Sequence, residues 1–280
     1  MGGGGVRRGG TGTTKLWSLA TRRVTSAGMW KRLTRRGETE KSVLQPAPGM
    51  RIYAFGDVHG RFDLFDAARQ FILGDVEQAK PERPFAIFLG DIVDRGPASS
   101  AVVESLSRQD FPIPFLVLRG NHEQMMLEAL LEDGPLESWL RNGGVETLMS
   151  YNVALDECRD LGDVRAALLR AIPTEHLTFL QGLPVSAHSG DYFFCHAGIR
   201  PDVPLDEQVE ADLMWIRKPF LESRKKHPKM IVHGHTPVQQ PEFMPNRINI
   251  DTGAYATGNL TCLILDGPDA VPVSIRADEH

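Results

Sequence analysis

Three short polar motifs, each directly after an apolar run, constrain the fold of this chain more than any other feature. The runs read as buried strands. The motifs that follow them are GDVHG (56–60) after Arg51–Phe55, GDIVDRG (90–96) after Phe85–Leu89, and RGNHE (119–123) after Ile113–Leu118. In α/β proteins the loops past the carboxyl ends of strands are where ligands bind. One Asp-x-x-Asp-Arg loop alone could be a turn with a salt bridge, but three successive strands ending this way indicate a shared site.

The remaining hydrophobic pattern predicts an α/β fold with two sheets. Helical patterns at Leu64–Leu73 and around Ala98–Ser107 separate the three strands, which predicts a mainly parallel sheet. Several helices follow the third motif, through residue 183. Strand-like runs then return at Val185–Ala187, Asp191–Cys195, Met230–Val232, Arg247–Asp251 and Leu260–Leu265. We therefore expect a hairpin-rich second sheet that packs face to face with the first, with helices outside both.

Charge divides the chain into a basic arm and an acidic remainder. Up to Lys41 there are ten Lys or Arg against two Glu, a net +8, so the −5 of the whole chain leaves −13 for the rest. Residues 1–45 are also Gly-rich with few apolar residues, which predicts a disordered N-terminal arm; residues 46–280 are expected to form the folded domain. A weak amphipathic helix in the arm would contact an anionic membrane, and an organellar transit peptide stays open. The acidic remainder argues against a nucleic-acid partner.

Cysteine spacing and hydropathy narrow the class of protein further. Cys158, Cys195 and Cys262 are scattered and show no C-x-x-C spacing, which argues against a disulfide framework or a zinc knuckle. Reduced thiols indicate a cytoplasmic protein. No apolar run approaches the ~20 residues that a membrane-spanning helix needs.

Six possible metal ligands follow predicted strand ends, and none of them is a thiolate. Such oxygen and nitrogen donors suit Mn²⁺, Fe or Zn²⁺ rather than Ca²⁺ or an iron–sulfur cluster. Two-metal hydrolases need a shared ligand between ions about 3.5–4 Å apart, and the carboxylate of the middle loop is the natural candidate. The six residues are Asp57, His59, Asp91, Asn121, His196 and His235.

In order, the motifs GDVHG, GDIVDRG, RGNHE, HAG (196–198) and HGHTP (233–237) resemble those of a known family. They are similar to the phosphoprotein phosphatase family of calcineurin-like metallophosphoesterases, above all to its bacterial and phage serine/threonine phosphatases. The symmetrical diadenosine tetraphosphate hydrolases share most of the pattern. The resemblance covers about residues 50–265. It implies a calcineurin-like fold, a four-layer α-β-β-α sandwich, within the catalytic domain 46–280.

The resemblance also implies a role for each matching residue. One metal ion would be held by Asp57, His59 and a bridging Asp91, and the other by Asp91, Asn121, His196 and His235. His122 would be the general acid, held by Asp94, while Arg95 and Arg217 (in MWIR) would bind phosphate oxygens. His233 would be a neighbour able to orient substrate or a ligand.

The reaction implied is hydrolysis of a phosphomonoester by water activated between two divalent metal ions, with Mn²⁺ favoured and Fe or Zn possible. The first prediction is a serine/threonine protein phosphatase acting on a phosphoprotein or phosphopeptide. The alternative is a symmetrical diadenosine tetraphosphate (dinucleoside polyphosphate) hydrolase. A phosphotyrosine-directed enzyme and a non-catalytic binding protein stay open. Trp139 and Tyr151 could stack a base, although Trp139 fits a core position as well; Cys195 is expected to be a packed thiol, and Asp251 part of a turn.

Overall fold

The computed structural model describes residue 1, residues 44–131 and residues 134–277. Residues 43–280 form one unit of the chain. The predicted basic arm and its membrane contact therefore lie outside the described residues, apart from Met1, Leu44 and Gln45. Leu44 packs against the core between the sheets, and the Gln45 N–H donates to Asp191 Oδ2 at 2.9 Å.

The first sheet has the strand order β10-β9-β1-β2-β3. The three predicted strands β1 (Met50–Phe55), β2 (Arg83–Phe88) and β3 (Phe115–Val117) are parallel. Helices α1 (Phe62–Ala79) and α2 (Ser99–Ser107) connect them, so the predicted βαβ alternation is confirmed. Antiparallel strands β9 (Leu260–Asp266) and β10 (Asp269–Ile275) complete the sheet. The prediction missed β10, an edge strand that contains a proline and lies largely in solvent.

The second sheet has the order β4-β5-β6-β8-β7. Only β4 (Ser186–Ser189) and β5 (Tyr192–Cys195) form the predicted hairpin, whereas β5, β6 (Met230–His233) and β8 (Arg247–Asn249) run parallel. The prediction of a hairpin-rich sheet was thus only partly right. The short strand β7 (Glu242–Phe243) pairs with β8 at the edge. Parallel strands bring the ends of β5 and β6 to one edge of this sheet, as β1, β2 and β3 do in the other.

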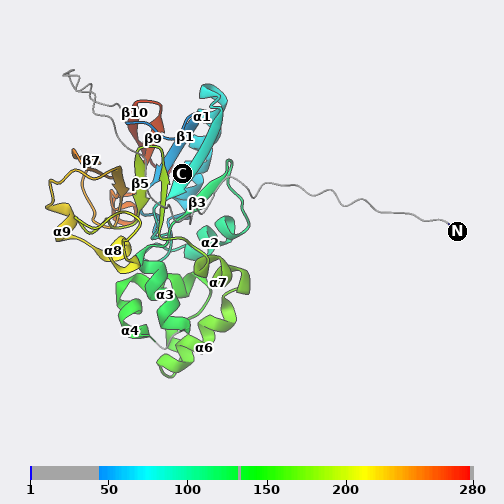
Figure 1. The fold of residues 1–280 in the computed structure, drawn as a ribbon. Coiled ribbons are helices and arrows are strands. Elements are labelled where there is room, and N and C mark those ends of the chain that lie inside the picture. The colour runs from blue at the N-terminus through cyan, green and yellow to red at the C-terminus, as the bar shows by residue number, and fades with distance from the viewer. Residues whose placement is uncertain (2–43, 132–133, 278–280) are drawn as a thin grey trace, which may run out of the picture. The chain divides into compact units, whose positions relative to one another are not determined.

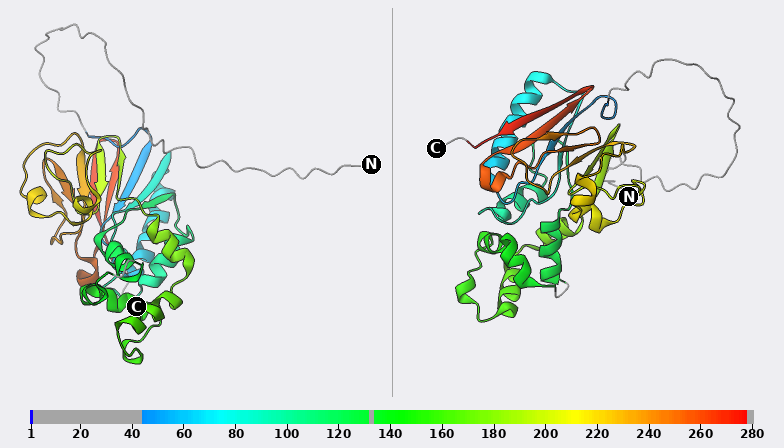
Figure 2. Two further views of the ribbon diagram at one scale, coloured as in Figure 1. Left: turned by 60° about the horizontal axis from the view of Figure 1, so that its bottom comes forward. Right: turned by 90° about the vertical axis from the view of Figure 1, so that its left-hand side faces the viewer.

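Three apolar clusters define four layers (Figures 1 and 2). One cluster, which includes Ile52, Leu263 and Phe194, lies between the sheets. A second joins the other face of the first sheet to α1 and α2. The third packs Cys195 and the outer face of the second sheet against the segment of α8 (Glu210–Trp215) and α9 (Lys218–Leu221). The α-β-β-α sandwich predicted from the motifs is confirmed.

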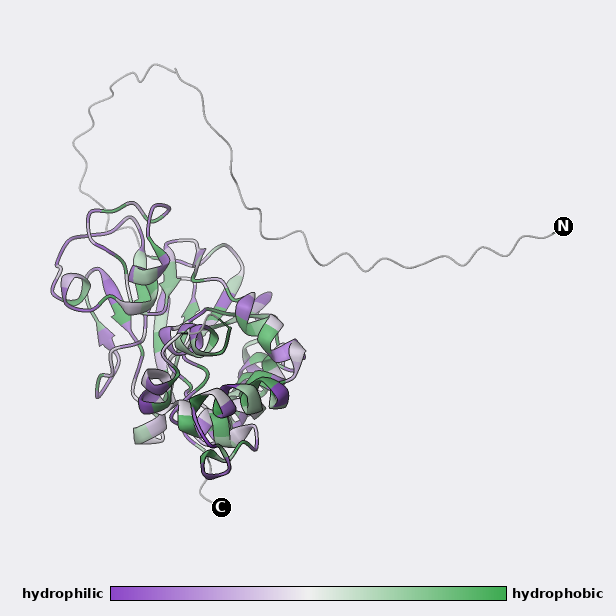
Figure 3. Cartoon of the chain, turned by 90° about the horizontal axis from the view of Figure 1, so that it is seen from below, coloured by the Kyte–Doolittle hydropathy of each residue, from purple (hydrophilic) through white to green (hydrophobic). Residues whose placement is uncertain are grey.

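A helical region follows β3 and lies below the sheets in Figures 1 and 2. Its elements are α3 (Asn121–Leu131), α4 (Leu136–Trp139), a π turn η1 (Leu140–Gly144), α5 (Val145–Ser150), a 3₁₀ turn η2 (Leu155–Glu157), α6 (Leu161–Ala171) and α7 (Thr174–Gln181). In Figure 3 the helices carry both green and purple stretches, as elements with one buried face do. Among the helices described, none is both long and apolar enough to cross a bilayer.

The helical region reaches the first sheet through Gly143. Its carbonyl oxygen accepts the Arg95 N–H at 3.0 Å. Gly143 has φ of 107°, and a Cβ there would lie 2.6 Å from Arg95 Cγ. Only glycine meets both conditions, so Gly143 fixes the backbone of the Arg95 loop.

Candidate metal centre

All six predicted ligands meet at one place, where the loops after β1, β2, β3, β5 and β6 converge. Each of the six side chains is at most 6% exposed. They come from positions as far apart as residues 57 and 235, so only the fold brings them together. Polar and ionisable side chains are rarely buried together in a protein core, so a cluster of this size is typical of a binding or catalytic site.

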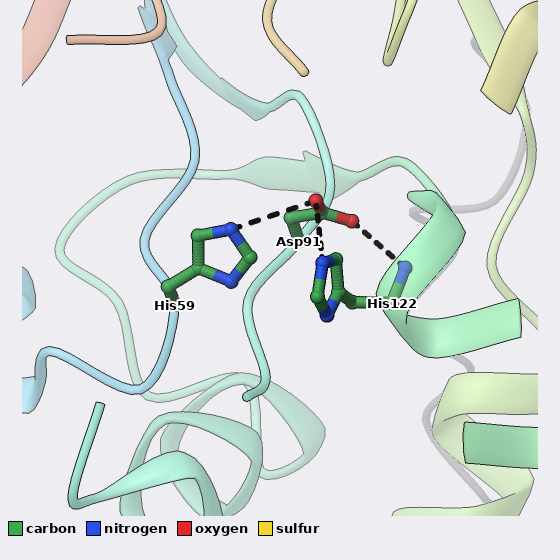
Figure 4. Close-up of side chains that lie close together, drawn as sticks. All are labelled: His59, Asp91 and His122. Atoms are coloured by element: carbon green, nitrogen blue, oxygen red, sulfur yellow. Dashed lines mark hydrogen bonds and ion pairs between the residues drawn. The ribbon is translucent and has the colours of Figure 1, made fainter. Parts of the chain in front are cut away.

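Asp91 lies at the centre of this cluster. Its Oδ2 is 3.6 Å from His59 Nε2 and 3.3 Å from His196 Nε2. Figure 4 shows His59 and His122 on either side of the Asp91 carboxylate, with the His122 backbone N–H donating to Oδ1 at 3.0 Å. Asp91 therefore has the position expected of a ligand shared between two ions.

The donors predicted for one ion already have the spacing that an ion would impose. Asn121 Oδ1 is 2.9 Å from His196 Nε2 and 2.8 Å from His235 Nδ1, and the two imidazole nitrogens are 3.2 Å apart. An ion with bonds of about 2.1 Å holds neighbouring ligands roughly 3 Å apart in octahedral geometry. The spacing of these donors, which were predicted together with Asp91 to hold the second ion, fits a divalent cation.

The other predicted group is looser and strongly acidic. Asp57 Oδ2 lies 4.0 Å from His59 Nε2, and Asp57 Oδ1 accepts the His235 backbone N–H at 3.2 Å. Burial and the neighbouring carboxylate of Asp251 raise the pKa of Asp57 well above its usual value. Asp251 is itself 2% exposed, and its Oδ2 has no hydrogen-bond partner among the described residues. A bound cation would remove this conflict, because it balances the buried negative charge.

The rings of two predicted histidine ligands are oriented by backbone carbonyls. His59 Nδ1 is 2.9 Å from the Val93 oxygen, and His196 Nδ1 is 3.0 Å from the Leu89 oxygen. Each Nδ1–H donates to its carbonyl, so that Nε2 is the ring nitrogen that faces the centre. Such second contacts fix the tautomer that a metal ligand needs.

Several site residues have an unusual backbone conformation. Left-handed φ angles, between 47° and 72°, occur at His59, Asp91, Asp94, Arg95 and His235. Non-glycine residues adopt this region at an energetic cost, and such residues concentrate at functional sites. With these φ angles, side chains of neighbouring loop residues can point toward the same metal centre.

Glu123 holds the Asp91 loop and was not assigned from the sequence. Its buried carboxylate accepts backbone N–H groups from four residues, at 2.8–3.2 Å; the donors are Asp91, Ile92, Val93 and Gly120. Acidic residues that follow a motif histidine are common, so spacing alone gave no signal for this role. The contacts show that Glu123 ties the loop after β2 to the start of α3.

Replacing Glu123 with Ala is expected to lower the free energy of unfolding by at least about 3 kcal/mol. Several buried N–H donors lose their partner, at roughly 1–3 kcal/mol for each. Urea unfolding of the metal-free protein measures this. Glu77→Ala is the matched control, since Glu77 lies exposed on α1. Equal stability of the two variants would contradict the assigned role of Glu123.

His122 and Asp94 form the predicted pair. His122 Nδ1 lies 2.7 Å from Asp94 Oδ2. Burial lowers the pKa of His122, but attraction to Asp91 and the bond to Asp94 outweigh it and raise the pKa above its usual value. Thr147 Oγ1 donates to Asp94 at 2.7 Å and Trp139 Nε1 at 3.0 Å. Trp139 is a core residue, as its spacing indicates, but its N–H also positions Asp94.

The two predicted phosphate-binding arginines lie on different sides of the cluster. Arg95 donates to His59 Nε2 and to His122 Nε2, both at 3.0 Å. Arg217 donates through Nε to His235 Nε2 at 3.0 Å and is exposed. Each guanidinium thus reaches one of the two proposed ion sites.

Other expectations have clear outcomes. His233, the last residue of β6, is fully buried and packs edge-on against Phe220 at 5.0 Å in the outer layer, so it has no direct access to a substrate. Tyr151 offers no free ring, since it is 7% exposed and bonded to His176, and Trp139 is equally buried. Cys195 is buried, and burial raises the pKa of its thiol, as expected of a packed side chain.

The fold and this cluster together define a metal-dependent phosphoesterase. A family model for calcineurin-like phosphoesterases matches residues 50–280, and the chain belongs to that family. Membership of this family implies that the protein uses divalent metal ions and hydrolyses a phosphate ester or anhydride bond. The serine/threonine phosphatase subtype stays a prediction.

Similar proteins carry more specific names. The chain is 27% identical over 247 residues to the bis(5'-nucleosyl)-tetraphosphatase PrpE [asymmetrical] of Geobacillus thermodenitrificans, covering 81% of this chain and 94% of the relative. It is 28% identical to the protein of the same name from Bacillus mycoides, covering 76% and 90%. A crystal structure described provisionally as a diadenosine tetraphosphatase aligns with a TM-score of 0.58, at 22% identity, covering 84% of this chain and 98% of that one. This structural likeness supports the fold alone.

Proposed function

We propose that the protein hydrolyses dinucleoside polyphosphates such as diadenosine tetraphosphate. The observation that carries this proposal is the similarity to relatives named asymmetrical bis(5'-nucleosyl)-tetraphosphatases, along 90–94% of their length. This reverses the order of the two functions predicted from the motifs, because the shared metal centre does not distinguish them. The predicted alternative was a symmetrical hydrolase, whereas the relatives are named asymmetrical, so the two agree in the class of substrate and not in the position of cleavage.

Asp57, His59 and Asp91 would hold one ion, and Asp91, Asn121, His196 and His235 the other. Mn²⁺ is favoured, and Fe or Zn²⁺ fits the same donors. When bound, such ions supply an ionised water near neutral pH and balance charge on the phosphate oxygens.

The protein's own residues would bind the phosphate chain and manage the proton. Arg95 and Arg217 carry N–H groups that suit non-bridging phosphate oxygens. When phosphate oxygens accept the Arg95 N–H groups, His122 Nε2 is free to carry its own proton. The Asp94 carboxylate keeps Nδ1–H in place, so that Nε2 faces the oxygen that departs.

A second candidate, hydrolysis of phosphoserine or phosphothreonine, is favoured by the buried Asp94–His122 pair. A departing alkoxide must be protonated, whereas a nucleotide phosphate departs readily as an anion. The Asp94 carboxylate lies 2.7 Å from His122 Nδ1 and is held by two further donors, Thr147 and Trp139. Such an arrangement positions His122 to donate a proton. The phosphoprotein reaction is therefore tested beside the first.

Offering both substrates to the Mn²⁺-loaded protein separates the proposals. We expect diadenosine tetraphosphate to turn over with a higher kcat/KM than phosphoserine, phosphothreonine or phosphotyrosine peptides. Chromatography of the products distinguishes AMP plus ATP from two ADP. Turnover of phosphopeptides alone would overturn the first proposal and support the second.

A further inference from the structure

We propose that Tyr255 and Trp215 are stacking surfaces for the two bases of the substrate, one at each end of the metal centre. This inference rests on the proposed function, and it names the groups that select a dinucleotide over a bare phosphate chain. It replaces Trp139 and Tyr151, which are buried.

Exposure separates these two rings from the other aromatic side chains. Among the described residues, only Trp215, Phe243 and Tyr255 are exposed aromatics, at 44%, 48% and 39%. Two of the three contact residues of the metal centre, whereas Phe243 lies on the edge strand β7. Exposed rings that gather at a polar site indicate a ligand with its own flat apolar surface.

Tyr255 lies beside the residues proposed for the first ion. It sits in α10 (Ala254–Thr257), directly after the Asp251 turn. Its ring centroid is 5.4 Å from that of His59 in an edge contact, and the Arg95 guanidinium carbon is 4.8 Å from the ring centroid. The ring and a phosphate-binding arginine are therefore adjacent.

Trp215 has the corresponding place beside the second ion. It is the last residue of α8, two residues before Arg217. Its ring centroid is 6.4 Å from that of His235, with the ring planes at 77°. His235 in turn accepts the Arg217 Nε–H at 3.0 Å. Here too an exposed ring accompanies a phosphate-binding arginine.

The cluster between the rings is continuous. His59 contacts Asp91, Asp91 contacts His196, and His196 contacts His235, all within 3.6 Å. Tyr255 thus contacts the first residue of this chain of contacts and Trp215 contacts the last, with Asp91 between them. A ring next to an arginine at each end matches a polyphosphate with a base at each end. Stacking on a ring tolerates any base, because every base has a flat π-face.

The test compares diadenosine tetraphosphate with inorganic tetraphosphate, which has the same phosphate chain and no base. We expect Tyr255→Leu and Trp215→Leu each to lower the ratio of their kcat/KM values by roughly tenfold, the order of one base stack. Tyr255→Phe should retain the ratio, and Phe243→Leu is the matched control at an exposed ring outside the site. Equal losses for both substrates would overturn the inference, since the rings would then only order Arg95 and His235.

Binding gives a second readout that does not depend on turnover. A methylene-bridged analogue of diadenosine tetraphosphate should quench tryptophan fluorescence of the protein, and Trp215→Phe should remove most of that change. Inorganic tetraphosphate should quench less. Quenching by the analogue in a protein that does not hydrolyse diadenosine tetraphosphate would refute the proposed function and keep the inference. Hydrolysis with unchanged substrate ratios in both Leu variants would do the reverse.

Discussion

Replacing His122 with Asn is expected to lower kcat on a phosphoserine peptide by about 10²–10⁴-fold, the usual contribution of a positioned proton donor. The loss on diadenosine tetraphosphate should be smaller, because its departing group is a stable anion. Metal content, measured by elemental analysis, should be unchanged if His122 is the acid. Loss of an ion would instead make His122 a ligand, because its ring lies close to His59 and Asp91 and the three could together hold a metal ion. Steady-state kinetics on both substrates measures the difference.

Asp94→Asn tests the same pair through pH. Asp94 helps to raise the pKa of His122, so removal of its charge should lower that pKa. The acid form of His122 is then lost at a lower pH, and the alkaline limb of the kcat profile should move to lower pH. A profile that keeps its position while activity falls would assign Asp94 a purely structural role. Full activity of His122→Asn on both substrates would exclude His122 as the acid.

The convergence of the candidate ligands could be predicted from the sequence because each lies in a short motif directly after a strand. GDVHG, GDIVDRG and RGNHE each follow a strand, and strand ends converge wherever strands run parallel. Asp57, Asp91 and Asn121 could therefore be placed together before any coordinates. His196 and His235 also follow predicted strand ends, but their strands lie in a second sheet whose direction the hydrophobic pattern did not give. Only the resemblance assigned them, with Asp91 and Asn121, to one ion.

The residues that were missed act through tertiary contacts that leave no local pattern. Glu123 looks like any acidic residue early in a helix, yet it accepts four backbone N–H groups from two loops. Trp139 is at core spacing, and only the fold shows that its indole N–H reaches Asp94. Tyr255 and Trp215 lie in short segments whose hydrophobic pattern has no periodicity, so the sequence did not single them out. Such roles depend on which elements meet, and sequence spacing carries no information about that.

Replacing Asp91 with Asn is expected to have the largest effect of all. One carboxylate serves both proposed ions, so its loss should reduce bound Mn²⁺ from two ions per chain to one or fewer. Several kcal/mol of charge stabilisation are lost with an ion, which corresponds to a fall in kcat of at least about 10³-fold. Asn has nearly the same shape and retains an oxygen for the His122 backbone N–H, so the fold should survive.

Elemental analysis and thermal unfolding distinguish this outcome from simple misfolding. Mn²⁺ is expected to bind the folded wild type in preference to its unfolded chain and so to raise its Tm, whereas Asp91→Asn should show a native-like transition with a much smaller rise. Asp206→Asn is the matched control, because it makes the same charge change at an exposed loop position. If Asp91→Asn bound two ions with wild-type affinity, the shared carboxylate would have to be another residue. Asp251 would then be the first to examine, since its Oδ2 is buried among the same acidic groups and has no partner among the described residues.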